Sequence, residues 1–305
     1  KNIMPTKSSS SPSLFFKYGV LTLIALIWGS QFMINKIILL DFNPEGLAFF
    51  RALIGCVTLC FLIPVSSEKN KPLKLTFVQI FILFLIGFLE ATLPFYLIAY
   101  GQLYVPSSIT SILMASIALF TLIFVVLFIK HETVSRLKII GIILGFIGVF
   151  ILVFPDLNFK SHDVKLFFGE LAILGGAFCF SSSLILIKSF CQDLPPIRTA
   201  RLILFFAVIQ LALVSIFHWR PFWHQPPSLL AIFYLLMLGI FAAGIVYVLY
   251  VILIRRAGAT FTGLTNYLVP VVGIFMGVVI LGESLRLSSF IATGVILLAM
   301  VLCEF

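Results

Sequence analysis

Charged residues are scarce in this chain of 305 residues. They make up 10% of it, against about 25% in an average soluble protein, while apolar and aromatic residues make up 62%. A soluble fold needs more polar surface than this to meet water. The composition excludes a cytosolic enzyme, a secreted disulfide-rich protein and a disordered chain. It favours an all-α polytopic membrane protein.

Patterns for disulfides, metals and nucleotides are also missing. The five cysteines lie mostly within apolar runs and have no loop spacing, so we expect buried thiols. The four histidines fall in links or at the ends of apolar runs, which leaves an intramembrane serine enzyme without a general base. No P-loop pattern occurs, which argues against ATP hydrolysis. We expect no enzyme activity, no metal and no cofactor.

Ten long apolar runs occupy most of the chain, and each has close to the ~20 residues that one membrane span requires. Each is expected to be a helix, because hydrocarbon offers the backbone no other hydrogen-bond partner. The expected spans are 18–39, 45–65, 76–100, 107–129, 137–154, 167–188, 197–217, 228–254, 259–281 and 287–304.

The charges that are present are mostly basic and lie in the links. The 20 Lys and Arg residues exceed the 11 Asp and Glu residues, and thirteen of the bases lie on the inner side when the N-terminus is inside, against five outside. The positive-inside rule explains this distribution better than a nucleic-acid partner does. We expect both termini in the cytoplasm, with residues 1–17 as a tail and not a signal peptide.

An internal repeat with an offset of about 150 residues divides the chain. The matched pairs are Gly19 with Gly169, Arg51 with Arg201, Tyr96 with Tyr247, and Glu132 with Glu283. Chance similarity between apolar helices is the alternative explanation, but several charged or aromatic matches at one offset favour a true repeat. A repeated unit of five spans enters the membrane from the opposite side, so we expect Glu132 to face the cytoplasm and Glu283 the exterior.

Inverted repeats are the architecture of secondary transporters, whose substrate site lies near the bilayer midplane. We therefore predict ten transmembrane helices arranged as two inverted five-helix repeats. The expected parts are a cytoplasmic tail (1–17), a first repeat (18–154), a connecting loop (155–166) and a second repeat (167–305).

Short motifs within the spans and at their acidic ends carry a family resemblance. They are Trp28-Gly29-Ser30 with Phe32, Arg51, the acidic ends at Glu132 and at Gly282-Glu283-Ser284, and Pro270. With these motifs the chain resembles the EamA-type members of the drug/metabolite transporter superfamily over nearly its whole length. The resemblance implies ten helices, both termini inside, a bacterial inner-membrane location and transport of small metabolites such as amino acids. One departure is Leu119, which stands where the second repeat has Pro270.

Glu90 is the sharpest functional signal, because it lies near the middle of a long apolar run. A carboxyl at the bilayer centre is costly and is a functional candidate by default. Pro94 leaves the Glu90 carbonyl without its helical donor and is expected to kink the helix as a hinge. We predict a proton-coupling and substrate-binding site at Glu90. The alternative is a permanently protonated Glu hydrogen-bonded inside the bundle.

Pro270 is a second expected hinge, since it frees the carbonyl of Asn266, whose amide can both donate and accept. Asn266 is a substrate-site candidate, and a purely structural kink is an equal alternative.

Other candidates for the substrate site are polar and aromatic. Trp28, Gln31 and Asn35 share one face of the first span, and that face should point to a cavity or another helix. Aromatic walls beside a carboxylate would suit an organic cation or an amino-acid side chain, although packing is the alternative. The aromatic candidates besides Trp28 are Tyr96, Tyr100, Tyr247 and Tyr250.

Arg51 and Arg201 lie within spans, one to two turns from an end. Long arginines in such places usually snorkel to the interface, which is the favoured interpretation. The alternative is that they serve as gate ion pairs or anchor a substrate carboxylate.

Together these features predict a secondary active transporter, expected to export small metabolites such as amino acids or organic cations in exchange for protons. Alternating access around a midplane cavity is the expected mechanism. A passive channel or facilitator is the alternative, and an intramembrane enzyme is less favoured. The expected partners are a small-molecule substrate and the lipid bilayer, with no nucleic acid, and the fused halves are expected to work as a monomer.

Overall fold

The computed structural model describes residues 14–65, 75–128, 135–153, 161–218, 222–257 and 259–304. Within these ranges the chain is helical apart from short turns, and its one extended pairing is an isolated bridge between Phe42 and Trp223. Most of the N-terminal tail, Glu132 and residues 155–160 of the predicted connecting loop lie outside the described residues.

The helices follow one another with short connections. In chain order they are α1 (Leu14–Ile38), α2 (Pro44–Leu62), η1 (Ile63–Val65), α3 (Phe77–Gly87), η2 (Phe88–Thr92), α4 (Leu93–Gln102), α5 (Ser107–Met114), α6 (Ser116–Phe128), α7 (Arg136–Val153), α8 (Ser161–Phe190), α9 (Pro196–His218), α10 (Leu229–Met237), η4 (Leu238–Ile245), α11 (Val246–Ala257), α12 (Ala259–Gly263), α13 (Thr265–Phe275), η5 (Met276–Ile280) and α14 (Leu287–Glu304).

Consecutive helices combine into membrane-length rods. In the described part of the chain, nine rods are long and apolar enough to cross a bilayer, and Leu287–Cys303 is an apolar helix that is somewhat shorter. The all-helical, multi-pass architecture predicted from the sequence is confirmed, whereas the count of ten spans stays a prediction.

The two halves of the chain pack against each other in matched pairs. α1 packs on α13 as α8 packs on α5 and α6, and α2 packs on η4 as α9 packs on α3 and η2. The last helix of each half, α7 and α14, form one pair, in which Gly141 and Gly148 lie against Ala299 and Ala292. This reciprocal packing is what two related five-helix units produce.

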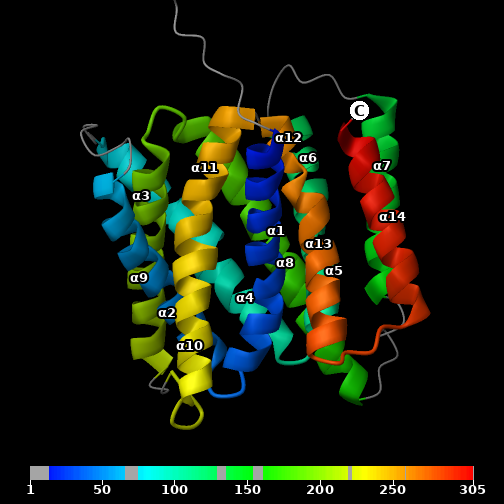
Figure 1. Cartoon of the computed structure of the whole chain (residues 1–305), viewed down its shortest axis with the longest axis horizontal. Coiled ribbons are helices and arrows are strands. Elements are labelled where there is room, and N and C mark those ends of the chain that lie inside the picture. Colours follow the sequence, from blue (N-terminus) through cyan, green and yellow to red (C-terminus); the bar gives the residue numbers. More distant parts are fainter. Residues whose placement is uncertain are drawn as a thin grey trace, which may run out of the picture.

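α1 begins and α14 ends at the same end of the bundle, the top of Figure 1. There Tyr18 of α1 packs edge-on against Phe261 of α12. The opposite end, here called the Asp41 end, holds the α1–α2 turn. It also holds the start of α10, because the Ser228 N–H donates to Asp41 at 2.9 Å.

Two π-helical segments lie at matching places in the two halves. η2 interrupts the third rod and η4 interrupts the eighth, and their first residues, Phe88 and Leu238, are 150 positions apart. The breaks between α5 and α6, and between α12 and α13, match in the same way. Because π turns are poorly stabilised and occur often at functional sites, the repeated irregularity marks the third rod of each half as the place to look for function.

Candidate functional site

Glu90 lies inside η2, where the hydrogen-bonded turn contains one residue more than an α-turn. The Leu93 N–H bonds to the Phe88 carbonyl five residues back, and Pro94 follows with no N–H to offer the Glu90 carbonyl. The π turn thus lies directly before the proline that the sequence predicts as a hinge. The Glu90 side chain is 7% exposed, so its carboxyl needs hydrogen-bond partners from the protein.

Two hydroxyl groups from the second half of the chain supply those partners. The Ser183 hydroxyl, on α8, donates to Oε2 of Glu90, and the Tyr247 hydroxyl, on α11, donates to Oε1 at 3.0 Å. A hydroxyl can donate to a carboxylate or turn and accept from a protonated carboxyl. Glu90 can therefore gain or lose a proton without losing its neighbours.

Aromatic side chains adjoin this carboxyl. The Tyr250 phenol, one turn after Tyr247, lies within electrostatic range of Glu90. Its ring contacts the Trp28 ring of α1, with the centroids 5.3 Å apart. Trp28 and the two tyrosines thus form a rim around the acid, drawn from both halves of the chain.

Arg51 brings a positive charge to the same region. Its guanidinium donates to Oε1 of Gln31 at 2.6 Å, lies 4.0 Å above the Phe95 ring, and is within electrostatic range of Tyr247. Arg51 is 5% exposed, so it does not reach the interface as a snorkelling arginine would. Its buried Nε has no hydrogen-bond partner within the described residues.

The structure therefore brings six of the predicted residues into one cluster, which we call the Glu90 cluster. They are Glu90, Trp28, Gln31, Arg51, Tyr247 and Tyr250. Ser183 completes the cluster, and the sequence analysis missed it. A serine in an apolar helix is a weak signal, because it can satisfy itself on its own backbone, as Ser183 also does with the Phe180 carbonyl.

The other predicted residues make different contacts. Asn35 donates to Gln102 at 2.8 Å, and Gln102 in turn donates to the Phe32 carbonyl, so these amides tie α1 to α4. Tyr96 and Tyr100 stack on each other with their centroids 6.2 Å apart. Nothing in these contacts tests whether the three residues bind substrate.

The remaining candidates lie on two further helices, α13 and α9. Asn266 is exposed on α13, Pro270 lies inside the same helix, and its carbonyl accepts from Ser111 of α5 at 3.4 Å. Arg201 is half-buried on α9, where its carbonyl faces the Cys56 thiol. Their assigned roles as site, hinge and gate stay predictions.

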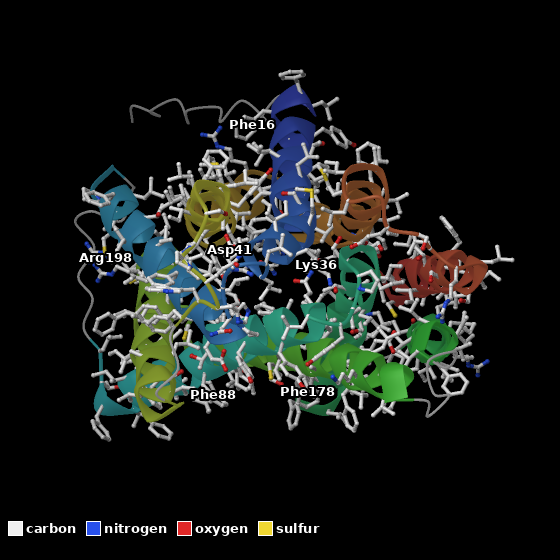
Figure 2. The ribbon with its side chains drawn as sticks, turned by 90° about the horizontal axis from the view of Figure 1, so that it is seen from below. Phe16, Lys36, Asp41, Phe88, Phe178 and Arg198 are labelled. Carbon is white, nitrogen blue, oxygen red and sulfur yellow. The ribbon has the colours of Figure 1, made fainter. Side chains whose placement is uncertain are left out.

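The Asp41 end holds two carboxylates that the sequence analysis did not single out as site residues. Asp41 accepts from the Ser228 N–H and hydroxyl and from Gln225, and these hydrogen bonds hold its pKa below the ordinary value. It thereby caps α10. Figure 2 looks onto this end and shows Asp41 and Lys36 toward the middle of the molecule, with Phe88 and Phe178 at its edge.

Glu283 caps a helix of the first half from the second half. Its carboxylate accepts from the N–H groups of Ser107 and Ser108, at 2.7 and 2.9 Å, at the start of α5. Burial alone raises the pKa of Glu283, but the hydrogen bonds from Ser108 and Ser107 outweigh burial and hold it below the ordinary value. Asp41 and Glu283 thus fasten the two halves together at one end.

Metal ligands are not grouped in the part of the chain that the structure describes, where no cluster of three His, Cys, Asp or Glu side chains occurs. The functional groups of the Glu90 cluster are a carboxyl, a guanidinium, hydroxyls and aromatic faces.

Comparison with known proteins places these features in context. The sequence profile of the EamA-like transporter family matches residues 16–154 and again 167–304. A "probable amino-acid metabolite efflux pump" of Salmonella typhimurium is 27% identical, over 86% of each chain. An uncharacterized transporter of Clostridium kluyveri is 25% identical, over 93% of this chain and 92% of its own.

Two further matches agree with these. The uncharacterized inner membrane transporter YedA of Escherichia coli is 26% identical over 93% of this chain and 89% of its own. A crystal structure of a protein that is 16% identical superposes with a TM-score of 0.64, over 94% of this chain and 95% of that one, which shows a shared fold.

Proposed function

The chain belongs to the EamA-like transporter family, and from this premise we propose that it exports a small zwitterionic or cationic metabolite in exchange for protons. It is a multi-pass membrane transporter of that family. The substrate class, the proton coupling and the mechanism are the proposal. The observation that carries it is the Glu90 cluster, in which an acid and a guanidinium are buried in one place without pairing with each other.

An amino acid fits the charges of this cluster. Within the described residues Arg51 makes no ion pair, and its Nε is unpartnered. A buried cation of this kind is costly unless an anion completes it, and a substrate carboxylate would do so. The substrate ammonium group would then bind Glu90, with the Trp28 and Tyr250 rings beside it through cation–π attraction.

Proton coupling follows from competition at Glu90. A protonated carboxyl has no charge with which to hold an ammonium group, so the proton and the substrate exclude each other. Exchange across the membrane then requires only that the site face one side at a time. A difference of one pH unit supplies about 1.4 kcal/mol per proton, enough for roughly tenfold accumulation of substrate.

The π segments and the caps suggest how the halves move. π turns are weakly held, and each lies where a third rod meets a second rod of the other half. The carboxylate caps of Asp41 and Glu283 hold the Asp41 end together in this structure. Alternating access would open this end by breaking these contacts while the Glu90 cluster stays near the middle.

Orientation belongs to the same proposal. The excess of basic residues in the links that flank the terminal end favours both termini in the cytoplasm of a bacterial inner membrane. Ten spans in two inverted halves would put positions 132 and 283 on opposite sides. Single cysteines introduced at these positions in a cysteine-free chain should react with an impermeant maleimide from opposite sides. Labelling of both positions from the same side would rule out the inverted topology.

The function itself is tested on protein reconstituted in lipid vesicles. A thermal-shift screen of amino acids, polyamines and quaternary amines first identifies a ligand, since binding raises apparent stability. Labelled ligand is then supplied with and without a pH gradient. Accumulation above the external concentration supports a coupled transporter. Equilibration without accumulation would show a facilitator, and chemical conversion of the ligand would show an enzyme.

A further inference from the structure

We propose that Gln210 is a positioning residue that holds the π turn in the geometry that aims Glu90 at Ser183 and Tyr247. The inference rests on the proposed function only for its consequence in transport. Its structural part concerns how the acid is presented.

Gln210 bridges the two ends of the π turn from a neighbouring rod. It lies on α9 and is 8% exposed. Its carbonyl accepts from the Thr92 hydroxyl at 2.6 Å, and its amide donates to the Phe84 carbonyl at 2.9 Å. Phe84 lies in the last turns of α3, and Thr92 is the last residue of η2, so one side chain spans the whole irregular segment.

A bridge at this place selects between two helical forms. A π turn closes its hydrogen bond over five residues, one more than an α-turn, and is much rarer. If the segment tightened to an α-turn, the residues on one side of it would rotate by about 100° relative to the other side. That rotation would turn Glu90 away from the two hydroxyls. Gln210 opposes it by fixing the distance between Phe84 and Thr92.

Within the described residues, the buried side-chain amide of Gln210 makes hydrogen bonds only to Thr92 and Phe84. An unpaired amide among apolar side chains would be costly, and Gln210 uses both of its polar ends on the π segment. The matching place in the other half is occupied by different residues. Cys60 stands 150 positions before Gln210, and Ala242 stands 150 positions after Thr92, so neither side chain can reproduce the bridge. The bridge accompanies the π turn that carries the acid.

The first test reads Glu90 directly by infrared spectroscopy of purified protein in lipid. Spectra recorded across a pH ramp show the carboxyl bands, and the Glu90 band is the one lost in Glu90→Gln. Gln210→Leu, which keeps the size and removes both hydrogen bonds, should shift or broaden this band. Thr92→Val should do the same and Thr92→Ser should not. Thr293→Val is the matched control, since that hydroxyl bonds only to Ser289 in its own helix.

The second test is transport of the ligand found by the thermal-shift screen. Gln210→Leu should lower pH-driven flux by at least ~10-fold, and should add nothing to the defect of Glu90→Gln. A shifted band with unchanged flux would keep the role of Gln210 and refute Glu90 as the coupling site. An unshifted Glu90 band in folded Gln210→Leu overturns the inference whatever the flux. If that variant does not fold, Thr92→Val decides by the same criterion.

Discussion

Two of the three π segments in the described residues, η2 and η4, occupy equivalent places in the two halves and differ in almost everything else. η2 carries Glu90 and meets α9 through the polar bridge of Gln210. η4 carries only apolar residues and meets α2 through close packing, where Gly239 lies against Ile54 and Ala243 against Gly55. Both halves therefore contain a π segment at this place, but only the segment of the first half has a titratable side chain. Under the proposed alternating access, the single acid Glu90 would serve both orientations of the site.

Arg51 joins the two segments, because α2 packs on η4 while the guanidinium lies over Phe95, just after η2. Arg51→Met should lower affinity for an amino-acid ligand by about 2–5 kcal/mol, at least ~30-fold, since a buried charge pair is lost. Affinity for the corresponding amine without a carboxylate should change little. Calorimetry on both ligands measures this.

The matched control for Arg51 is Arg198→Met in the first turn of α9, and Figure 2 shows Arg198 at the edge of the molecule. Equal losses for the amino acid and the amine would mean that Arg51 does not bind the carboxylate.

Tyr247 is, with Ser183, one of two residues of the second half that donate a hydrogen bond to the acid of the first. Tyr247→Phe removes one hydrogen bond to a group that can be charged, an interaction worth about 1.5–3 kcal/mol. Coupled flux should fall roughly tenfold or more. Tyr234→Phe on α10 is the control. Wild-type flux and pH dependence in Tyr247→Phe would remove Tyr247 from the mechanism.

A substitution of Gly239 tests the close packing of the apolar segment η4. A Cβ at this position would lie 2.5 Å from the Ile54 Cβ, so Gly239→Val must push η4 away from α2. Overpacking of this kind costs about 1–3 kcal/mol of stability, which a thermal-unfolding series detects. Gly294→Val, where nothing lies within 4 Å, is the control. Equal stability of the two variants would show that close packing at η4 is unimportant.

Glu283 tests the contact between the halves at the Asp41 end. Because its folded-state pKa lies below the ordinary value, its stabilising effect is complete above the unfolded-state pKa and is lost as pH falls through the folded-state pKa. Glu283→Gln should cost about 1 kcal/mol near neutral pH, as a lost helix cap does. The difference from the parent protein should vanish at low pH. A constant difference across the pH range would contradict the cap.

The sequence predicts the fold and the centre of the site for one reason, which is that polar residues are rare in it. Glu90 and Arg51 stand out because a charge inside a long apolar run is costly, and the structure places them in one cluster. Arg51 was nevertheless expected to snorkel, because nothing in the sequence shows that Gln31 and Phe95 face it.

The side-chain contacts that the sequence does not predict depend on the rotational orientation of each helix about its axis, which apolar sequences leave undefined. A rod that is hydrophobic on every face gives no sign of which side meets its neighbours. The π turn, invisible in the sequence, also shifts the phase of α4 relative to Glu90. Tyr96 and Tyr100, four residues apart on α4, stack on each other, while Ser183 and Gln210 hold the acid and its turn.

The most direct measurement is pH-gradient-driven accumulation by Glu90→Gln in reconstituted vesicles, beside Glu45→Gln at the start of α2 as the same change elsewhere. The account predicts that Glu90→Gln folds, binds lipid normally and accumulates no substrate at any gradient, while Glu45→Gln accumulates it as the parent protein does. Accumulation by Glu90→Gln at the parent rate, with the same dependence on pH, would contradict the assignment of Glu90 as the coupling site.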